Sequence, residues 1–498
     1  MRTNNISHAL ACRANRIFHR MLQRTPLALG FCISILLGAC AVGPNYQRPA
    51  LETPVQFKEN RAWVQTAPLA AEPQGAWWSV FGDTTLDTLE ARVATANQSL
   101  RAAYYAYQQA LALTRAARAA EFPTVDANAS ATRSASASPS GTGSHTLSNS
   151  VSLGLTASWA PDLWGRVRRQ VEASTAGAAA SRADLLAAQL SLQATLAQNY
   201  FQIRQIDSQV ALAQETVRAY EKSLQLTQNR YAAGVVSRAD VAQAQTQLAN
   251  ARVQQAAFGV QRAQLEHAIA VLTGTPASSF DLPRMPSLPQ PQAIPAGLPS
   301  QLLLRRPDLA AAERRVAAAN AQIGVAESAY FPALTLSAGG GYRGSSFANL
   351  LSAPNLFWSI GPALAQTLFD GGARRAQVAQ NEAAYQQTVA QYRQLSLQAF
   401  QQVEDQLAAL SILDHEAQLQ QQAVAAAEES LRLATNQYQA GTVPYLNVLT
   451  AQTAAYGARN SALQIAGQRL SASVALIQAL GGAWGSNDRP ALGESVRP

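Results

Sequence analysis

The chain has 498 residues and a formal net charge of +8, and only 14% of its residues are charged. Five arginines and no acidic residues lie in residues 1–39, so residues 40–498 carry 33 basic and 30 acidic side chains. This near balance gives no support for nucleic-acid binding. All three cysteines, Cys12, Cys32 and Cys40, lie in the first forty residues, which excludes disulfide, thiolate-metal and cysteine-nucleophile chemistry in the rest of the chain.

The N-terminal segment has the pattern of a bacterial lipoprotein signal. A basic stretch from Arg13 to Arg24 precedes an apolar run from Leu27 to Leu37 that is too short for a membrane-spanning helix. The sequence Leu37-Gly-Ala-Cys40 then resembles a lipobox, in which the cysteine becomes the lipidated N-terminus. We therefore predict a lipid on Cys40; the alternative is an ordinary signal peptide with an incidental cysteine. The residue after Cys40 is Ala41. An aspartate at this position retains bacterial lipoproteins at the inner membrane, so that rule does not apply here.

A proline-punctuated segment and a helix follow. Residues 45–74 show no regular period, which predicts an extended segment along the body. The sequence Trp77-Trp78-Ser-Val-Phe81-Gly-Asp83 leads into a helix that we place at Thr85 to Ala120, with Asp83 or Thr84 as its N-cap. The apolar face of this helix is supplied by Leu86, Leu89, Val93 and Leu100.

Two stretches in each half of the chain change to a period of two, which predicts β-strands. They lie at 124–132 and 151–159 in the first half, and at 334–342 and 358–364 in the second. Apolar residues alternate with small polar ones, which suits a transmembrane barrel with lipid outside and water inside. A soluble hairpin packed on helices is the alternative, and alternation alone favours it. Four strands cannot close a barrel, so a membrane-spanning sheet requires several chains, most simply three chains with twelve strands.

The stretch from Ala373 to Gln439 contains no glycine or proline and consists mostly of good helix formers. A helix of that length is about 100 Å long at about 1.5 Å per residue, so no compact core can bury it. Its apolar residues recur every seven positions, which predicts packing against other long helices. The row consists of Val389, Val403, Leu410, Ala417, Val424, Leu431 and Tyr438, with Ser396 as its one polar member. Two interpretations fit this heptad row: a coiled-coil rod, and one helix in the wall of a hollow helical cylinder.

The same pattern occurs 207 residues earlier in the chain. Asn229-Arg-Tyr-Ala-Ala-Gly234 matches Asn436-Gln-Tyr-Gln-Ala-Gly441, so the chain contains two copies of one long unit. The earlier row consists of Leu196, Ile203, Val210, Val217, Leu224 and Tyr231. Each repeat therefore reads helix, strand, strand, long helix, helix. We place the shorter helices at 85–120, 239–272, 307–329 and 446–480.

The predicted fold class is an α+β membrane protein with duplicated β-hairpins and very long α-helices. Pro276 to Pro299 is proline-rich and links the repeats as an extended segment. The predicted parts are a signal peptide (1–39), a lipidated extended segment (40–84), a first repeat (85–275), a linker (276–300), a second repeat (301–482) and a tail (483–498).

Several stretches resemble the TolC/OprM family of outer-membrane channels. The most specific is Leu304-Arg-Arg-Pro307-Asp308-Leu-Ala-Ala-Ala-Glu313, followed by Ala321-Gln-Ile-Gly324 and Tyr330-Phe-Pro332. The resemblance is also carried by Trp77-Trp78, by Phe81-Gly82-Asp83, and by the two Tyr-x-Ala-Gly turns with Asp240-Val241 and Asn447-Val448. Together with the lipobox, the chain is similar to the lipoprotein (NodT-type) subfamily that serves RND efflux systems.

The resemblance implies a trimer whose twelve-stranded barrel crosses the outer membrane of a Gram-negative bacterium and continues as a periplasmic α-helical barrel. It implies an exit duct of a tripartite pump that passively conducts drugs or other small molecules. The expected partners are a periplasmic membrane-fusion (adaptor) protein and an inner-membrane, proton-driven RND transporter. No cofactor is expected apart from the lipid on Cys40.

The resemblance also implies where the gate lies. The turns at Gly234 and Gly441 would form the closed periplasmic tip that meets the adaptor. Around the gate would lie Arg238, Asp240, Val443, Asn447 and Thr450. Related proteins often carry inward-facing aspartates at the positions of Asn447 and Thr450, so we expect no carboxylate ring here. Asp240 either holds the closed state through a hydrogen bond at the tip or simply caps its helix.

No catalytic motif is present in the sequence. His415-Glu416 lacks the second histidine of a zinc site, and Ala338-Gly-Gly-Gly lacks the Lys and Ser/Thr of a phosphate-binding loop. We therefore predict that the protein is not an enzyme, although a periplasmic hydrolase remains a weak third hypothesis. The alternatives are an outer-membrane component of peptide or protein secretion, and a lipid-anchored coiled-coil scaffold without a pore.

Overall fold

The structure is a computed structural model that describes residues 41–59, 76–137, 145–289, 294 and 305–482. They fall into two compact units. Unit 1 consists of the described residues within Met1–Arg48, Gln109–Ala178 and Arg314–Val389. Unit 2 consists of those within Pro49–Gln108, Ala179–Glu313 and Ala390–Pro498. The predicted signal peptide with Cys40, part of the predicted linker and the tail from 483 lie outside the described residues. Among the described residues, no helix is both long enough and apolar enough to cross a membrane.

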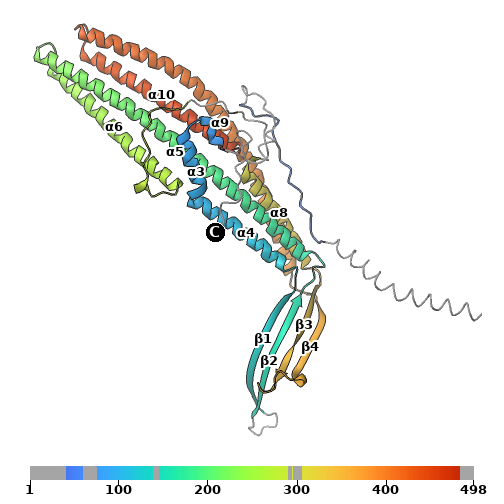
Figure 1. The fold of residues 1–498 in the computed structure, drawn as a ribbon. Helices are drawn as coiled ribbons and strands as arrows, with labels where there is room; N and C mark the ends of the chain where they lie inside the picture. The colour runs from blue at the N-terminus through green and yellow to red at the C-terminus, as the bar shows by residue number, and fades with distance from the viewer. Residues whose placement is uncertain (1–40, 60–75, 138–144, 290–293, 295–304, 483–498) are drawn as a thin grey trace, which may run out of the picture. The chain divides into compact units, whose positions relative to one another are not determined.

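Unit 1 contains one antiparallel sheet in the order β1-β2-β3-β4 (Figure 1). Its strands are β1 (Thr124–Ala137), β2 (His145–Trp159), β3 (Ala333–Gly344) and β4 (Leu356–Ala365). The hairpins of the two repeats pair through β2 and β3, from Val151 opposite Gly344 to Trp159 opposite Leu336. A short 3-10 helix, Ala353–Asn355, precedes β4. The period-two pattern thus predicted all four strands, and within the chain β1 and β4 are open edges.

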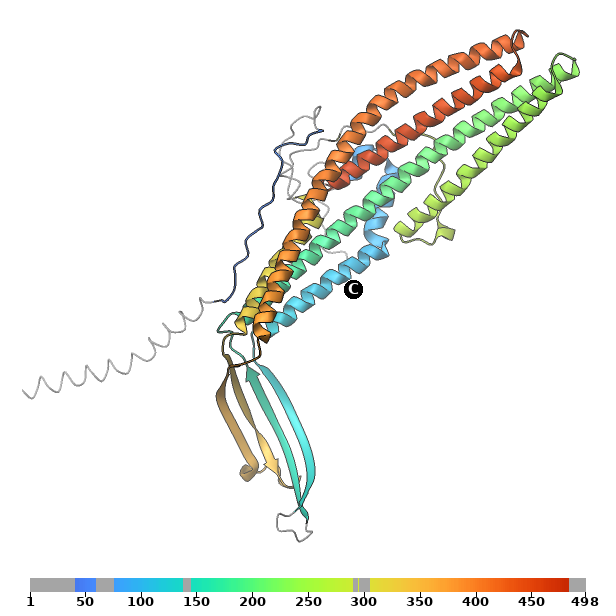
Figure 2. The same cartoon turned by 180° about the vertical axis from the view of Figure 1, so that it is seen from behind.

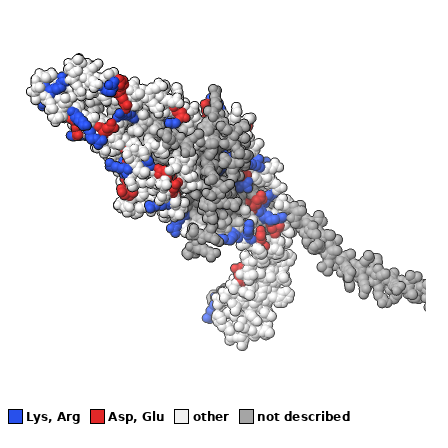
Figure 3. Space-filling view, turned by 45° about the horizontal axis from the view of Figure 1, so that its top comes forward, with Lys and Arg blue, Asp and Glu red and all other residues white. Residues whose placement is uncertain are grey.

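The two faces of this sheet differ. Side-chain hydroxyls pair across the β1–β2 ladder, with 2.8 Å between the Oγ atoms of Ser130 and Ser152. On the other face, Trp358 and Ile360 are each 76% exposed. The sheet also shows few charged side chains on the face drawn in Figure 3. The soluble-hairpin alternative would require the apolar face to pack on helices, and it does not. This face therefore needs an apolar environment of another kind.

The long helices are α5 (Arg166–Ala232) and α9 (Ala373–Gln439), each of 67 residues. The shorter α6 (Arg238–Leu272) and α10 (Tyr445–Ala479) follow them and lie beside them in unit 2 (Figures 1 and 2). The predicted heptad row of α9 is confirmed, because its members are buried or half-buried along the helix, whereas most of their neighbours are exposed. Its buried members are Val389, Ser396, Val403 and Tyr438.

The predicted helix at 85–120 is two helices, α3 (Thr84–Ala96) and α4 (Gln98–Ala119). Asn97 separates them in an extended conformation. Its side chain accepts a hydrogen bond from Leu100 N (2.9 Å) and donates one to the carbonyl oxygen of Leu272 (2.8 Å). The prediction of one helix was wrong because this asparagine caps α4 and is tied to the end of α6. Asp83 is the N-cap of α3, as one of the two predicted choices.

The core of unit 2 is built around α3, α5, α9 and α10, with the 3-10 helix Trp77–Phe81 packed against it. Asp83 Oδ2 accepts hydrogen bonds from Tyr200 and Arg204, both at 2.7 Å. Arg306 lies just before α8 (Pro307–Ser328) and donates to Gln402 Oε1 on α9 (2.7 Å). It also bonds Asp308, so the motif that carries the family resemblance joins α8 to α9.

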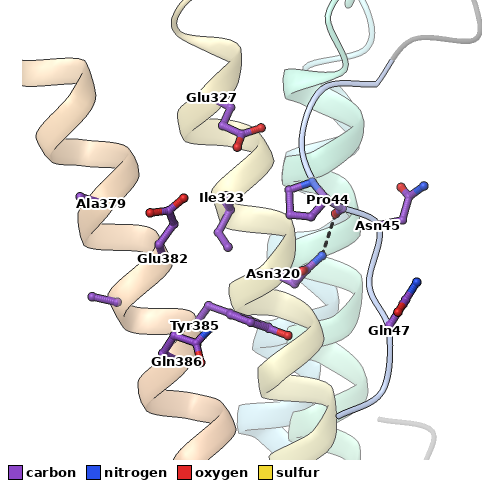
Figure 4. Close-up of a pocket in the computed structure, with 11 residues that line it drawn as sticks. Pro44, Asn45, Gln47, Asn320, Ile323, Glu327, Ala379, Glu382, Tyr385 and Gln386 are labelled. Carbon is purple, nitrogen blue, oxygen red and sulfur yellow. Dashed lines mark hydrogen bonds between the residues drawn. The ribbon is translucent and has the colours of Figure 1, made fainter. Parts of the chain in front are cut away.

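In unit 1, the N-terminal segment from residue 41 lies against α5 and α8 (Figure 4). Arg169, only 5% exposed, donates to the carbonyl oxygens of Val42 and Gly43, both at 3.0 Å. Asn320 of α8 donates to the carbonyl oxygen of Pro44 (2.8 Å). A cavity of about 1110 Å³ lies between this segment, α8 and α9. The backbone immediately after Cys40 is therefore held at the helix surface.

Candidate functional site

The candidate site consists of residues 229–241 and 436–448, which we call the tip; both segments belong to unit 2. Gly234 and Gly441 end the long helices with φ values of +77° and +80°, a conformation that other residues adopt only with strain. The amide of Gly234 donates to Tyr231 O (2.9 Å), and that of Gly441 donates to Tyr438 O (3.0 Å). The two turns are thus duplicated in hydrogen bonding as well as in sequence.

The two turns are joined by a contact between the repeats. The guanidinium of Arg230, at the end of α5, donates to the carbonyl oxygen of Tyr438 on α9. Its Cζ also lies 4.5 Å from the Tyr438 ring centroid, which is cation–π geometry. The ring of Tyr438 packs edge-on against Tyr445 of α10 at 5.6 Å, and both tyrosines are 2% exposed.

Neutral hydrogen bonds extend this contact. Ser223 Oγ donates to the Tyr445 hydroxyl at 3.4 Å. Burial raises the pKa of the Tyr445 hydroxyl, and this hydrogen bond opposes the rise. Farther from the tip, Gln247 Nε2 of α6 donates to Tyr220 of α5 and to Thr453 of α10, both at 3.1 Å. At this level, hydrogen bonds between neutral side chains therefore join the helices of the two repeats.

Asp240 forms a capping box at the start of α6. Its Oδ2 accepts hydrogen bonds from the backbone N and the Oγ of Ser237, both at 2.9 Å, and its own amide donates to Ser237 Oγ. The structure therefore shows one of the two predicted roles of Asp240, the helix cap. The other role, holding the closed state, stays a prediction. Arg238 is exposed, and its Cζ lies 6.0 Å from the ring centroid of Tyr231.

The other predicted gate residues lie at the start of α10. Asn447 and Thr450 are exposed, and Val443 is half-buried against the cluster of Tyr438 and Tyr445. Thr450 Oγ1 donates back to Leu446 O at 2.9 Å. These positions carry no carboxylate, so no ring of acids can form at them. Their place at a gate stays a prediction.

Sequence reasoning missed Arg230, Tyr438 and Tyr445 as the residues that join the turns. One signal was present: Arg230 stands where the second repeat has Gln437, in a duplicated motif that differs at only one other position, Ala232 against Gln439. A basic residue in only one of two matching turns suggests that it contacts the other turn. The contacts described at the tip are side-chain packing and hydrogen bonds. Within the described ranges, no group of His, Cys, Asp and Glu is placed to hold a metal ion.

Comparisons with known proteins extend these observations. Residues 91–275 and 298–482 match the family model described as Outer membrane efflux protein. The chain is 31% identical over 461 residues to the cation efflux system protein CusC of Escherichia coli O6:H1, covering 92% of this chain and 98% of that protein. It is 33% identical over 466 residues to the pyoverdine export outer membrane protein OpmQ of Pseudomonas aeruginosa, covering 92% and 97%. The outer-membrane channel OprN superposes with a TM-score of 0.84 at 30% identity, covering 89% of this chain and 100% of that structure.

Proposed function

The chain belongs to the outer membrane efflux protein family, and from this premise we propose that it forms the outer-membrane exit duct of a tripartite RND-type efflux pump. The family match covers both repeats, and the similarity to solved channels extends over nearly the whole of those structures. The single observation that carries the proposal is the sheet, whose apolar side chains are exposed and whose β1 and β4 edges are unpaired within the chain. Such a sheet is stable in a bilayer only when other copies close it.

Three copies close the sheet in the simplest way. Each contributes four strands, so β4 of one copy pairs with β1 of the next and twelve strands surround a polar lumen. The hydroxyl pairs between β1 and β2 then face water, and Trp358 and Ile360 face lipid. The long helices of the three copies continue as a periplasmic helical barrel.

The tip is the surface for the partners. In this proposal, the turns at Gly234 and Gly441 meet a periplasmic adaptor protein, which connects the duct to an inner-membrane RND transporter. The duct conducts passively and catalyses no reaction, so the energy comes from the transporter. A lipid on Cys40 adds an anchor in the outer membrane, and the backbone that follows it is held by Arg169.

The cargo is a small molecule of a kind that the transporter selects. CusC is named for cation efflux and OpmQ for pyoverdine export, yet both are similar to this chain to nearly the same degree. The wall of a duct in this family therefore tolerates unlike cargoes.

The experiment is to purify the lipidated protein in detergent, measure its mass, and record its conductance in planar bilayers. We expect a trimer and ion conductance. In parallel, co-expression with an adaptor and an RND transporter in an efflux-deficient host should lower the accumulation of a small-molecule substrate. A monomer without conductance would favour the scaffold alternative, and conductance combined with peptide rather than small-molecule export would favour a secretion duct.

A further inference from the structure

Unit 2 contains a groove of about 1030 Å³ lined by α5, α6, α9 and α10. Eleven of its nineteen lining residues carry a carboxamide side chain, and none is charged. On α5 the amides are Gln198, Gln202, Gln205 and Gln209, which recur every three or four residues and so form one stripe along the helix. We call this surface the amide groove.

Two of the amides on α5 contact α10. Gln209 Nε2 of α5 donates to Asn460 Oδ1 of α10 at 2.9 Å. Beside it, the side chain of Gln205 lies against Gly467 of α10, where a Cβ atom would stand 1.8 Å from Gln205 Oε1. A glycine at position 467 thus leaves room for this amide.

The opposite face of α5 is charged and covered. Asp207 lies two residues after Gln205, so the two side chains are separated by about 200° around the helix axis. Its carboxylate accepts from Arg262 Nε (2.8 Å) and from the backbone N of Met285 (3.0 Å). Arg204 Nη2 donates to Ser287 O at 2.7 Å. The chain between the two repeats therefore runs over this face, which cannot line an open conduit.

The amide face remains open. Gln202 on α5, Gln261 on α6 and Gln464 on α10 are exposed, although the helices that carry them are packed together. Carboxamides offer both donors and acceptors, so they can replace part of the water shell of cationic, anionic and neutral groups alike. Fixed charges, in contrast, concentrate ions of one sign.

We propose that the amide groove lines the water-filled conduit and forms a section of its wall that hydrogen-bonds polar solutes without preference for the sign of their charge. This inference rests on the proposed function and deepens it, because it names the residues that a polar solute meets in the helical part. A duct with such a wall serves transporters whose cargoes differ in charge.

The first test changes the charge of the groove at an exposed position. Gln202→Glu and Gln202→Lys each place three like charges around the conduit of a trimer. The reversal potential in a salt gradient should show a cation-to-anion permeability ratio raised about twofold or more by Glu and lowered as much by Lys. The control is Gln225→Glu, on the same helix and exposed but outside the groove, which should leave the ratio unchanged.

The second test uses a thiol. The sequence contains no cysteine after Cys40, so Gln202→Cys introduces a single thiol into the rest of the mature chain. Cationic and anionic methanethiosulfonate reagents should block the current at rates that agree within about threefold, because no fixed charge attracts either one. Gln225→Cys should not produce block.

The outcomes separate the two proposals. If the wild-type trimer neither conducts nor restores efflux, the proposed function fails. If it conducts while Gln202→Glu and Gln202→Lys leave the permeability ratio unchanged and Gln202→Cys is not blocked, the function stands and the amide groove is not the conduit wall. If the two reagents differ in rate by tenfold or more, the groove lines the conduit but does not form a charge-neutral section, which also overturns the inference.

Discussion

Arg230 of the first repeat holds Tyr438 of the second through two contacts at once, a hydrogen bond to its carbonyl oxygen and a cation–π contact with its ring at 4.5 Å. Tyr438 is 2% exposed, so these contacts lie at a well-packed junction. A hydrogen bond from a charged donor is worth about 1.5–3 kcal/mol, and a cation–π contact adds about 0.5 kcal/mol or more. This pair is therefore the strongest single link that we identify between the two turns of the tip.

Replacing Arg230 should loosen the tip. In Arg230→Ala the Tyr438 carbonyl loses its side-chain donor and the two helical hairpins can separate. A loss of about 1.5 kcal/mol shifts a closed–open equilibrium about tenfold, so single-channel recordings should show a clear rise in open probability or conductance. Arg230→Lys should be intermediate, because a lysine keeps the charge but loses the planar guanidinium.

The matched control for this prediction is Arg432→Ala on α9. Among the residues that the structure describes, Arg432 bonds only Glu429 of its own helix, at 2.6 Å, and both side chains are exposed. Its removal should leave conductance at the wild-type level. Equal effects of Arg230→Ala and Arg432→Ala would mean that the loss of a positive charge, rather than the link between repeats, changes the gate.

The capping box of α6 predicts a different pattern for Asp240. If capping is its whole role, Ser237→Ala and Asp240→Ala should each destabilise the start of α6 by about 1 kcal/mol, whereas Asp240→Asn should stay close to wild type because asparagine keeps an acceptor. Hydrogen exchange of the amides at residues 238–241 measures this directly. A rise in conductance in both Asp240→Ala and Asp240→Asn, without a change in exchange, would instead show that the carboxylate charge holds the gate.

Most of the fold could be predicted from the amino-acid sequence, because the patterns that indicate strands, long helices and turns occur in both repeats. The period of two predicted the strands, the period of seven predicted the buried row of α9, and the duplicated Ala-Gly turns predicted where the long helices end. These patterns are local, because they consist of a short period or of a turn residue such as Gly234. They can therefore be recognised in a single sequence.

The contacts that were not predicted are those between segments far apart in the chain. Asn97 breaks a helix pattern because its side chain caps α4 and reaches Leu272, 175 positions away. Arg230 finds its partner 208 positions away, and Gln209 bonds Asn460 across 251. Nothing in the local pattern around these residues names the partner, because tertiary packing decides it.

Gly324 should be essential for holding the N-terminal segment. A Cβ atom at this position of α8 would lie 2.8 Å from the carbonyl oxygen of Val42 and 3.0 Å from Cγ of Arg169. Gly324→Ala should therefore displace the segment that follows Cys40, even though alanine favours the helix itself by up to about 1 kcal/mol. Limited proteolysis should cut residues 41–48 faster in this variant.

Gly177→Ala is the matched control for this substitution. Gly177 lies within α5, and a Cβ atom there would meet nothing within 4 Å. We expect this variant to resist proteolysis at least as well as wild type and to unfold at the same or a higher temperature. If Gly324→Ala behaves in the same way, the N-terminal segment is not held by its fit against α8.

Glu90 of α3 should make the stability of unit 2 depend on pH. It is completely buried on the same helix as Leu86, Leu89 and Val93, and neither carboxyl oxygen has a hydrogen-bond partner among the described residues. Burial raises its pKa from 4.5 to about 9. Below pH 4.5 the carboxyl is protonated in both the folded and the unfolded chain. Between pH 4.5 and 9 only the unfolded chain loses the proton, so the free energy of unfolding falls as the pH rises.

Glu90→Gln removes this dependence while it preserves the size of the side chain. The fall amounts to about 1.4 kcal/mol per pH unit, which at pH 7 gives up to about 3 kcal/mol of destabilisation in wild type. Thermal unfolding of the detergent-solubilised trimer should therefore show equal stability of variant and wild type near pH 4, and a growing advantage of Glu90→Gln up to pH 9. The exposed Glu121→Gln serves as the control for the loss of one carboxylate. A difference in thermal stability between wild type and Glu90→Gln that stays constant across this pH range would contradict the prediction. It would mean that Glu90 is ionised in the folded protein and that a nearby group stabilises its charge.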